Sequence, residues 1–214
     1  MAFFNLKKRE IECKIVYYGP GRSGKTTNVH QIHSAFRQHL VTDLVSIDAD
    51  GDQTLFLDFL AIDLGRIADC NVRVQLYTVP GQVRYSSTRK LVLREVDGIV
   101  FVADSLAARR EKNLISLKDL QQNLSEYKKS IFKLPLVLQY NKRDLNGNGI
   151  PILPVMALEK DLNSQLRVPY IEASAIRGEG VGETLKACVK LTLASLQHQM
   201  NWMKGQTGHG EKRS

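Results

Sequence analysis

Residues 19–26 carry the pattern with the clearest chemical meaning in this sequence. They read Gly-Pro-Gly-Arg-Ser-Gly-Lys-Thr and fit the phosphate-loop pattern G-x-x-x-x-G-K-[ST]. In such a loop the backbone N–H groups and the positive end of the next helix surround an anion, and the outer glycines remove Cβ atoms that would block it. Lys25 supplies a charge for β- and γ-phosphate oxygens, and the Thr26 hydroxyl is a ligand for Mg²⁺. The pattern predicts binding of a nucleoside triphosphate.

A second pattern, Asn141-Lys-Arg-Asp144, predicts which base is bound. The Asp144 carboxylate can accept from two adjacent donors, which matches N1–H and the exocyclic amine of guanine. Adenine lacks this donor pair and would leave the carboxylate desolvated without a partner, so we expect discrimination by about 10⁴ or more. Ser174 and Ala175 follow the last predicted strand, where their backbone N–H groups are expected to add contacts to the base.

The third pattern, Val79-Pro-Gly-Gln82, ends another predicted strand. Gly81 allows its backbone N–H to approach a γ-phosphate, and the Gln82 amide can both donate to and accept from an attacking water. We therefore predict in-line attack of water on the γ-phosphate. Gln82 would orient the water, while Lys25, the loop amides and Mg²⁺ stabilise the developing charge.

These loops require strands whose carboxyl ends meet at one edge of a sheet. Dense apolar or β-branched runs alternate with stretches that repeat every three to four residues, which predicts an α/β fold with a mostly parallel, six-stranded sheet, helices on both faces and a ligand crevice at the carboxyl ends. Strands are predicted at 11–18, 55–64, 72–79, 98–104, 134–140 and 170–173, and helices at 25–38, 114–127 and 181–196, the last running on through Met203. We assign residues 1–204 to one domain with an N-terminal strand extension, and 205–214 to a disordered tail.

The composition narrows the class of protein. The chain has 214 residues, enough for one full domain, and 30 Lys and Arg against 22 Asp and Glu give a net charge of +8. This charge favours an anionic partner, but no basic motif is interleaved with aromatic residues, so DNA is not expected. The three cysteines lack the spacing of a disulfide framework or zinc site, and no apolar stretch is long enough to span a membrane. We expect a cytoplasmic protein.

The residues of these motifs resemble those of one protein family. The segments KIVYYGPGRSGKTTN, TLFLDFL, LYTVPGQVRY and QYNKRDL are similar to the MglA family of bacterial Ras-like small GTPases, proteins of cell polarity and gliding motility. The resemblance covers about residues 5 to 197. It implies a P-loop NTPase with a Ras-like small G domain that binds GTP and Mg²⁺, hydrolyses GTP slowly to GDP and phosphate, and acts as a monomer with a Roadblock-type MglB activator. Other polarity or motility effectors are implied as partners that could recruit it to a cell pole.

The resemblance, together with the chemistry of the residues themselves, assigns roles to individual positions. Catalytic roles fall to Gln82 and Lys25, with Arg22 as a further candidate, and the metal ligands are Thr26, Thr54 and Asp58. The nucleotide-binding residues are Gly19, Pro20, Gly21, Arg22, Ser23, Gly24, Lys25, Thr26, Thr27, Thr54, Gly81, Asn141, Lys142, Asp144, Ser174 and Ala175.

Three positions depart from Ras-like patterns or from the family. The third-strand motif of ordinary Ras-like proteins begins with an Asp that serves the Mg²⁺ shell, whereas this chain has Thr78, as MglA proteins do. Asp58 lies within an apolar run and could replace that carboxylate through water, or it could be a hydrogen-bonded structural residue. Gln53 stands where the family usually has an arginine finger, which is typically worth 10³ to 10⁵ in rate. Arg22, in the phosphate loop, is the third departure. Its charge could compensate for the missing arginine finger, or its side chain could be solvated.

The missing arginine leaves a second function open, a GTP-dependent interaction module with negligible hydrolysis. A basic cluster in the second switch segment is a further candidate feature. It could bind an acidic partner or form a solvated helix face, and its members are Arg84, Arg89, Lys90 and Arg94.

Overall fold

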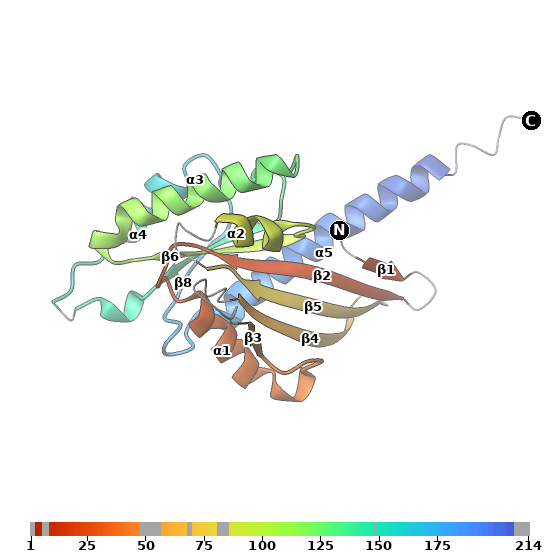
Figure 1. The fold of residues 1–214 in the computed structure, drawn as a ribbon, viewed down its shortest axis with the longest axis horizontal. Coiled ribbons are helices and arrows are strands. Elements are labelled where there is room, and N and C mark those ends of the chain that lie inside the picture. The colour runs from red at the N-terminus through yellow and green to blue at the C-terminus, as the bar shows by residue number, and fades with distance from the viewer. Residues whose placement is uncertain are drawn as a thin grey trace, which may run out of the picture.

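The computed structural model describes residues 3–5, 9–47, 57–67, 70–80, 86–147 and 149–207, and Figure 1 shows a central sheet with helices packed against it. The strands are β1 (Phe3–Asn5), β2 (Glu10–Tyr18), β3 (Val45–Ile47), β4 (Leu57–Ile67), β5 (Cys70–Thr78), β6 (Gly98–Asp104), β7 (Leu136–Asn141) and β8 (Tyr170–Glu172). The helices are α1 (Lys25–Ala35), α2 (Ser86–Leu93), α3 (Arg110–Glu126), α4 (Val155–Leu158) and α5 (Val181–Thr207). Short 3₁₀ turns cover Arg37–His39, Ala107–Arg109 and Arg143–Leu145, and a π-helical turn covers Glu159–Asn163.

The strand order explains where a ligand can bind. Within the described residues the order is β3-β4-β5-β2-β6-β7-β8, with β1 paired to β2. The pairs from β5 through β8 are parallel, while β4 runs antiparallel to β5. After β2 the chain forms the strands on one side of β2, and then the strands on its other side. This reversal leaves a crevice at the carboxyl ends of the strands. The predicted mostly parallel sheet of six strands is confirmed, and the three-residue strands β1 and β3 add to it.

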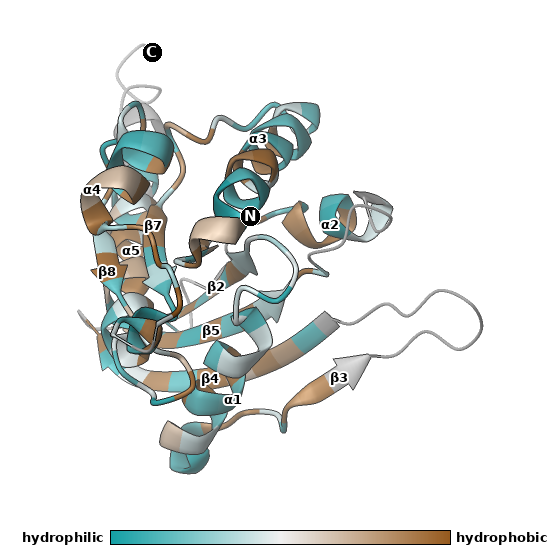
Figure 2. Cartoon of the chain, turned by 90° about the vertical axis from the view of Figure 1, so that its left-hand side faces the viewer, coloured by the Kyte–Doolittle hydropathy of each residue, from teal (hydrophilic) through white to brown (hydrophobic). Residues whose placement is uncertain are grey.

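Apolar side chains fill both faces of the sheet. One buried cluster joins α1 and α5 to the strands through residues such as Ile32 and Leu185, and a second joins α2, α3 and α4 through residues such as Leu93, Leu120 and Leu158. Figure 2 shows α2 and α3 on one side of the sheet and α1 on the other. Strand β6 is buried along its whole length, as expected for a strand covered on both faces. The predicted helices on both faces are therefore confirmed.

Several predicted boundaries differ from the structure. Helix α1 ends at Ala35 and is followed by a 3₁₀ turn, and β7 starts only after Pro135. Gly65 does not end its strand: β4 continues to Ile67 through a bulge between Asp63 and Arg66, where Gly65 adopts φ +71°. Helix α5 continues to Thr207, three residues into the segment predicted as a tail, and residues 208–214 lie outside the described part.

A buried amide network ties helix α1 to the middle of the sheet. The Asn28 and Gln139 carboxamides exchange two hydrogen bonds of 2.8 Å, and Gln139 also donates to the Thr184 hydroxyl at 3.0 Å. Asn28 donates a further bond of 2.9 Å to the Gly24 carbonyl. All three side chains are fully buried, so each bond satisfies a group that water cannot reach. The network fixes the start of α1 relative to β7 and α5.

Gln139→Leu should destabilise the protein, because the Asn28 carboxamide would lose its partner in a buried site. We expect the free energy of unfolding to fall by about 1–3 kcal/mol, measured by urea denaturation. Gln122 makes a matched control, since it is exposed on α3, and Gln122→Leu should change the free energy by less than about 0.5 kcal/mol. Equal effects of the two substitutions would contradict the proposed importance of the network.

Candidate functional site

The phosphate loop connects the end of β2 to the start of α1 and requires glycine at two positions. Gly19 has φ +144°, and a Cβ there would lie 2.2 Å from the Val102 carbonyl oxygen of β6. Gly24 has φ +100°, and its Cβ would lie 2.2 Å from the Asn141 Nδ2. Real Cβ atoms do not approach so closely, so a side chain at either position would force the loop away from its neighbours. The glycines thus allow the loop to pack against β6 and the Asn141 loop.

Lys25 lies at the centre of this loop. Its Nζ donates to the Gly19 carbonyl at 2.9 Å and to the Pro20 carbonyl at 2.7 Å, and the residue is only 7% exposed. Its pKa is lowered to about 7, first by burial and then by the charges of Arg89 and Arg109, while Asp58 acts in the opposite direction. An anion beside Lys25 would favour the ammonium form and raise this pKa again.

A cavity of about 680 Å³ opens over the loop. Its other walls are Thr78–Pro80 at the end of β5, Arg89 from α2, Arg109, and one side of α3. The predicted residues that border it are Gly19, Pro20, Gly21, Arg22, Gly24, Lys25, Thr26 and Thr27. The volume is in the range of small-ligand sites. Cationic side chains outnumber the carboxylates along its walls, which suits a highly charged anion.

Arg22 is exposed at the rim of this cavity and has φ +64°. Non-glycine residues seldom adopt this left-handed conformation, so the loop holds its backbone against a local preference. The structure therefore places the Arg22 side chain beside the cavity, as a phosphate contact requires, and its catalytic role stays a prediction.

Asn141 joins the predicted base loop to the phosphate loop. Its Nδ2 donates to the Ser23 carbonyl at 2.7 Å, and its Oδ1 accepts from the Ala175 N–H at 2.8 Å. The side chain is 2% exposed, so both bonds form away from water. The Ser174 N–H donates to the Glu179 carbonyl. Both N–H groups predicted to face the base thus have acceptors within the protein, and Ala175 positions Asn141; their contact with a base stays a prediction.

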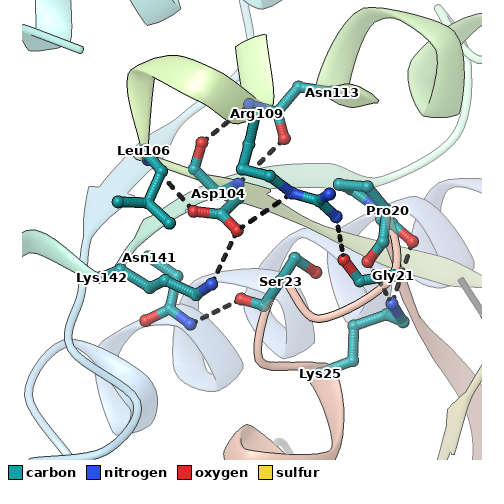
Figure 3. Close-up of polar contacts among 11 residues, drawn as sticks. Pro20, Gly21, Ser23, Lys25, Asp104, Leu106, Arg109, Asn113, Asn141 and Lys142 are labelled. Carbon is teal, nitrogen blue, oxygen red and sulfur yellow. Dashed lines mark hydrogen bonds and ion pairs between the residues drawn. The ribbon is translucent and has the colours of Figure 1, made fainter. Parts of the chain in front are cut away.

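Lys142 and Asp144 follow directly. The Lys142 Nζ donates to the Asp104 Oδ2 at 2.7 Å, and Asp104 is fully buried at the end of β6 (Figure 3). Asp144 lies half-buried on the 3₁₀ turn Arg143–Leu145. The turn is held because the Arg143 N–H donates to the Ala173 carbonyl and its guanidinium donates to Glu172. The loops after β7 and β8 therefore meet beside the phosphate loop.

Thr78 and Asp58 form a buried pair across β4 and β5. The Thr78 hydroxyl donates to the Asp58 Oδ2 at 3.0 Å and accepts from the Asp58 backbone N–H at 3.0 Å. Asp58 is 5% exposed, and its charge acts on Lys25. The carboxylate that is absent at position 78 is thus present on the neighbouring strand, next to Thr78.

The basic cluster of the second switch segment is not one exposed surface. Arg89 is 5% exposed, and its Nε donates to Asp119 of α3 at 2.9 Å while its Nη1 reaches the Pro80 carbonyl. The prediction that Arg89 lies on an acidic-partner surface or a solvated helix face is therefore wrong, because the residue points inward to the cavity. Lys90 is half-buried and pairs with Glu126 at 2.7 Å.

Three predicted site residues lie outside the described residues: Thr54, Gly81 and Gln82. Gln53 and Arg84 lie outside them as well. Conversely, sequence patterns missed Asp104 and Arg109. Asp104 ends a strand that is apolar throughout, so the rule that ligands bind at carboxyl ends of strands could have indicated it. Arg109 has no such signal, because its contacts arise only from folding.

The described residues contain neither a cluster of metal-ligating side chains nor a membrane-spanning helix. No group of three or more His, Cys, Asp or Glu side chains there could hold a metal ion. None of the helices in that part of the chain is both long and apolar enough to cross a membrane.

Comparison with known proteins agrees with this geometry. The Ras family matches residues 14–194. The mutual gliding-motility protein MglA of Myxococcus xanthus (strain DK1622) is 47% identical over 197 residues, which cover 92% of this chain and 98% of that protein. ADP-ribosylation factor-like protein 6 of Caenorhabditis elegans is 28% identical over 86% of this chain and 88% of its own length. ADP-ribosylation factor-like protein 2 of Arabidopsis thaliana is 26% identical over 83% and 86%.

The lowered pKa of Lys25 predicts that binding of a nucleoside triphosphate takes up a proton. The nucleotide-free lysine is largely neutral above pH 7, so the bound phosphates must draw a proton onto it, and affinity should fall as the pH rises from about 7 to 10. At pH 8 with Mg²⁺ we expect uptake of about 0.5–1 proton per GTP, measured by calorimetry in buffers of different ionisation heat.

Lys25→Arg is the control for this experiment, because a guanidinium stays charged throughout this pH range and should show no such uptake. Identical binding heats for the unmodified protein in all buffers at pH 8 would refute the linkage.

Proposed function

Because the chain belongs to the Ras family and is an MglA-type small GTPase, we propose that it is a molecular switch, which binds GTP with Mg²⁺ and hydrolyses it slowly to GDP and phosphate. In this proposal it regulates gliding motility or cell polarity as a cytoplasmic monomer. A Roadblock-type MglB protein would activate hydrolysis, and other effectors would recruit the switch to a cell pole.

One observation carries the proposal for guanine nucleotides. The Asn141 carboxamide bonds at the same time to Ser23 in the phosphate loop and to Ala175 after β8. A triphosphate held over Lys25 would therefore extend its base toward the loop that contains Asp144. Both ends of one nucleotide then fall within a single, hydrogen-bonded frame.

Hydrolysis in this frame needs little covalent chemistry from the protein. Water attacks the γ-phosphorus in line, its proton is lost, and the bond to the β–γ bridging oxygen breaks with the electrons leaving on GDP. Lys25 and the loop N–H groups stabilise the charge on the phosphate oxygens, and Gln82 is proposed to orient the water. Arg22, at the rim of the cavity, is proposed to add positive charge.

The residues present fit a bound Mg²⁺. This hard cation prefers oxygen ligands and keeps several waters, which agrees with a site built from hydroxyls, phosphates and the nearby Asp58 carboxylate. Thr26 is exposed at the start of α1 beside the cavity, and Thr54 is proposed as a second hydroxyl ligand. Bound Mg²⁺ would neutralise charge on the β- and γ-phosphates. We propose that Asp58 orients a metal-bound water, while Thr78 holds the carboxylate in place.

Asp58→Asn tests this role, since the amide oxygen can still accept from Thr78 but the negative charge is lost. We expect the Mg²⁺ concentration needed for tight GTP binding to rise by about 10- to 100-fold, as for other residues that orient a metal's ligands. Asp63→Asn is a matched control further along β4, where the side chain is 41% exposed. An unchanged Mg²⁺ requirement in Asp58→Asn would remove Asp58 from the metal site.

Gln53 favours a second candidate function. A neutral side chain cannot supply the charge of the arginine that relatives usually carry before the switch threonine, and such a charge is worth 10³ to 10⁵ in rate. The protein could then act as a GTP-dependent interaction module with negligible turnover. In that case GTP itself, and not its hydrolysis, would set the length of a signal.

Nucleotide binding followed by turnover tests both functions. We expect GTP and GDP to bind with a preference over ATP of about 10⁴ in the presence of Mg²⁺. Single-turnover hydrolysis should then be slow alone and accelerate with a Roadblock-type protein. No acceleration and no turnover would favour the interaction module, and equal affinity for GTP and ATP would rule out both.

A further inference from the structure

Arg109 lies directly against the phosphate loop, although it belongs to none of the sequence motifs. It ends the 3₁₀ turn Ala107–Arg109 that leads from β6 into α3. Its Nη2 donates to the Gly21 carbonyl, 88 residues away in the sequence, and the residue borders the cavity over the loop (Figure 3). Folding therefore brings a guanidinium to a site where phosphate is expected.

The guanidinium binds the loop next to the two carbonyls that hold the Lys25 ammonium. Lys25 bonds to the carbonyls of Gly19 and Pro20, and Arg109 bonds to the next carbonyl along the chain. The two cations are close enough for Arg109 to contribute to the lowered pKa of Lys25. In phosphate loops the lysine serves the β- and γ-phosphates, so Arg109 lies at that end of the triphosphate and not at the base.

Among the described residues, the charge of Arg109 is only partly balanced. Its carboxylate neighbour is Asp104, at 3.7 Å from the Arg109 Nε, but the same Asp104 Oδ2 is 2.7 Å from the Lys142 Nζ. One carboxylate thus serves two cations and is bound more closely to Lys142. The Gly21 carbonyl is a neutral acceptor, and a guanidinium has five N–H donors.

Arg89, in the same cavity, is an arginine whose charge a carboxylate balances. It takes both oxygens of Asp119, at 2.9 and 3.4 Å, and its side chain is 6% exposed. The Arg109 side chain is 29% exposed, so it can reorient at lower cost. A charged phosphate oxygen is a stronger acceptor than a backbone carbonyl and can bind two N–H groups of one guanidinium.

We propose that Arg109 exchanges the Gly21 carbonyl for the terminal phosphate of GTP and thereby makes the site favour the triphosphate over GDP. This inference rests on the proposed function, and it names a specificity-determining residue for it. Asp104 acts as a positioning residue, since its bonds to Lys142 and to the Leu106 N–H fix it beside Arg109. Arg109 would thus supply a positive charge from within this chain beside the terminal phosphate, whose negative charge the neutral Gln53 cannot neutralise.

Affinities of Arg109→Ala for a non-hydrolysable GTP analogue and for GDP, measured on the full chain with Mg²⁺, test this proposal. A lost bond to a charged group predicts a loss of about 10- to 100-fold for the triphosphate analogue. GDP lacks the terminal phosphate and should lose less than about threefold. Arg110→Ala is the matched control, because this neighbouring arginine pairs with Asp161 at 2.7 Å outside the cavity. It should change both affinities by less than about twofold.

Two outcomes would overturn the proposal. If Arg109→Ala weakens both nucleotides equally, Arg109 only holds the loop; if it weakens neither, the guanidinium does not contact phosphate. An unmodified protein that binds neither nucleotide would instead refute the proposed function. Should circular dichroism show that Arg109→Ala is unfolded, Arg109→Lys keeps the charge without the fork, and its loss should still be confined to the triphosphate analogue.

Discussion

The Asn141 carboxamide donates to Ser23 and accepts from Ala175, and the geometry of the whole candidate site depends on these two bonds. They connect the loops that follow β2, β7 and β8, three segments that are distant in sequence. The close approach requires a glycine at position 24, because any Cβ there would collide with the Asn141 amide. Because both ends of this buried carboxamide are satisfied, its two bonds determine how the three loops are spaced.

Charge explains why this frame should hold an anion. Lys25, Arg89 and Arg109 border one cavity. The carboxylates near them each bind a particular group: Asp119 binds Arg89, Asp104 binds Lys142, and Asp58 binds Thr78. Burial first, and then repulsion from Arg89 and Arg109, lowers the pKa of Lys25. A polyphosphate would offset this repulsion at several points at once, because its oxygens carry the opposite charge.

The sequence predicted the parts of the site that are local along the chain. A phosphate loop between a strand and a helix is specified within eight residues, and apolar periodicity located the six main strands. It could not predict contacts that only folding creates, such as Arg109 with Gly21 or Arg89 with Asp119, which lies 30 residues away. The end of a strand predicted at residue 64, just before Gly65, was wrong for a related reason. Glycine suits a turn and a bulge equally, and only the pairing of β4 with β5 decides between them.

The position of Asp58 follows from the way β4 pairs with β5. Phe59 pairs with Tyr77 in the antiparallel ladder, and this register brings Asp58 next to Thr78. A carboxylate on β4 can therefore reach the place that a carboxylate at the end of β5 would occupy. The position of Asp58 has a structural consequence, because β4 pairs with β3 on one side and with β5 on the other. Under the role proposed for Asp58, a change in the pairing of β4 with β3 or β5 would also displace the carboxylate, so the sheet and the metal site would be energetically coupled.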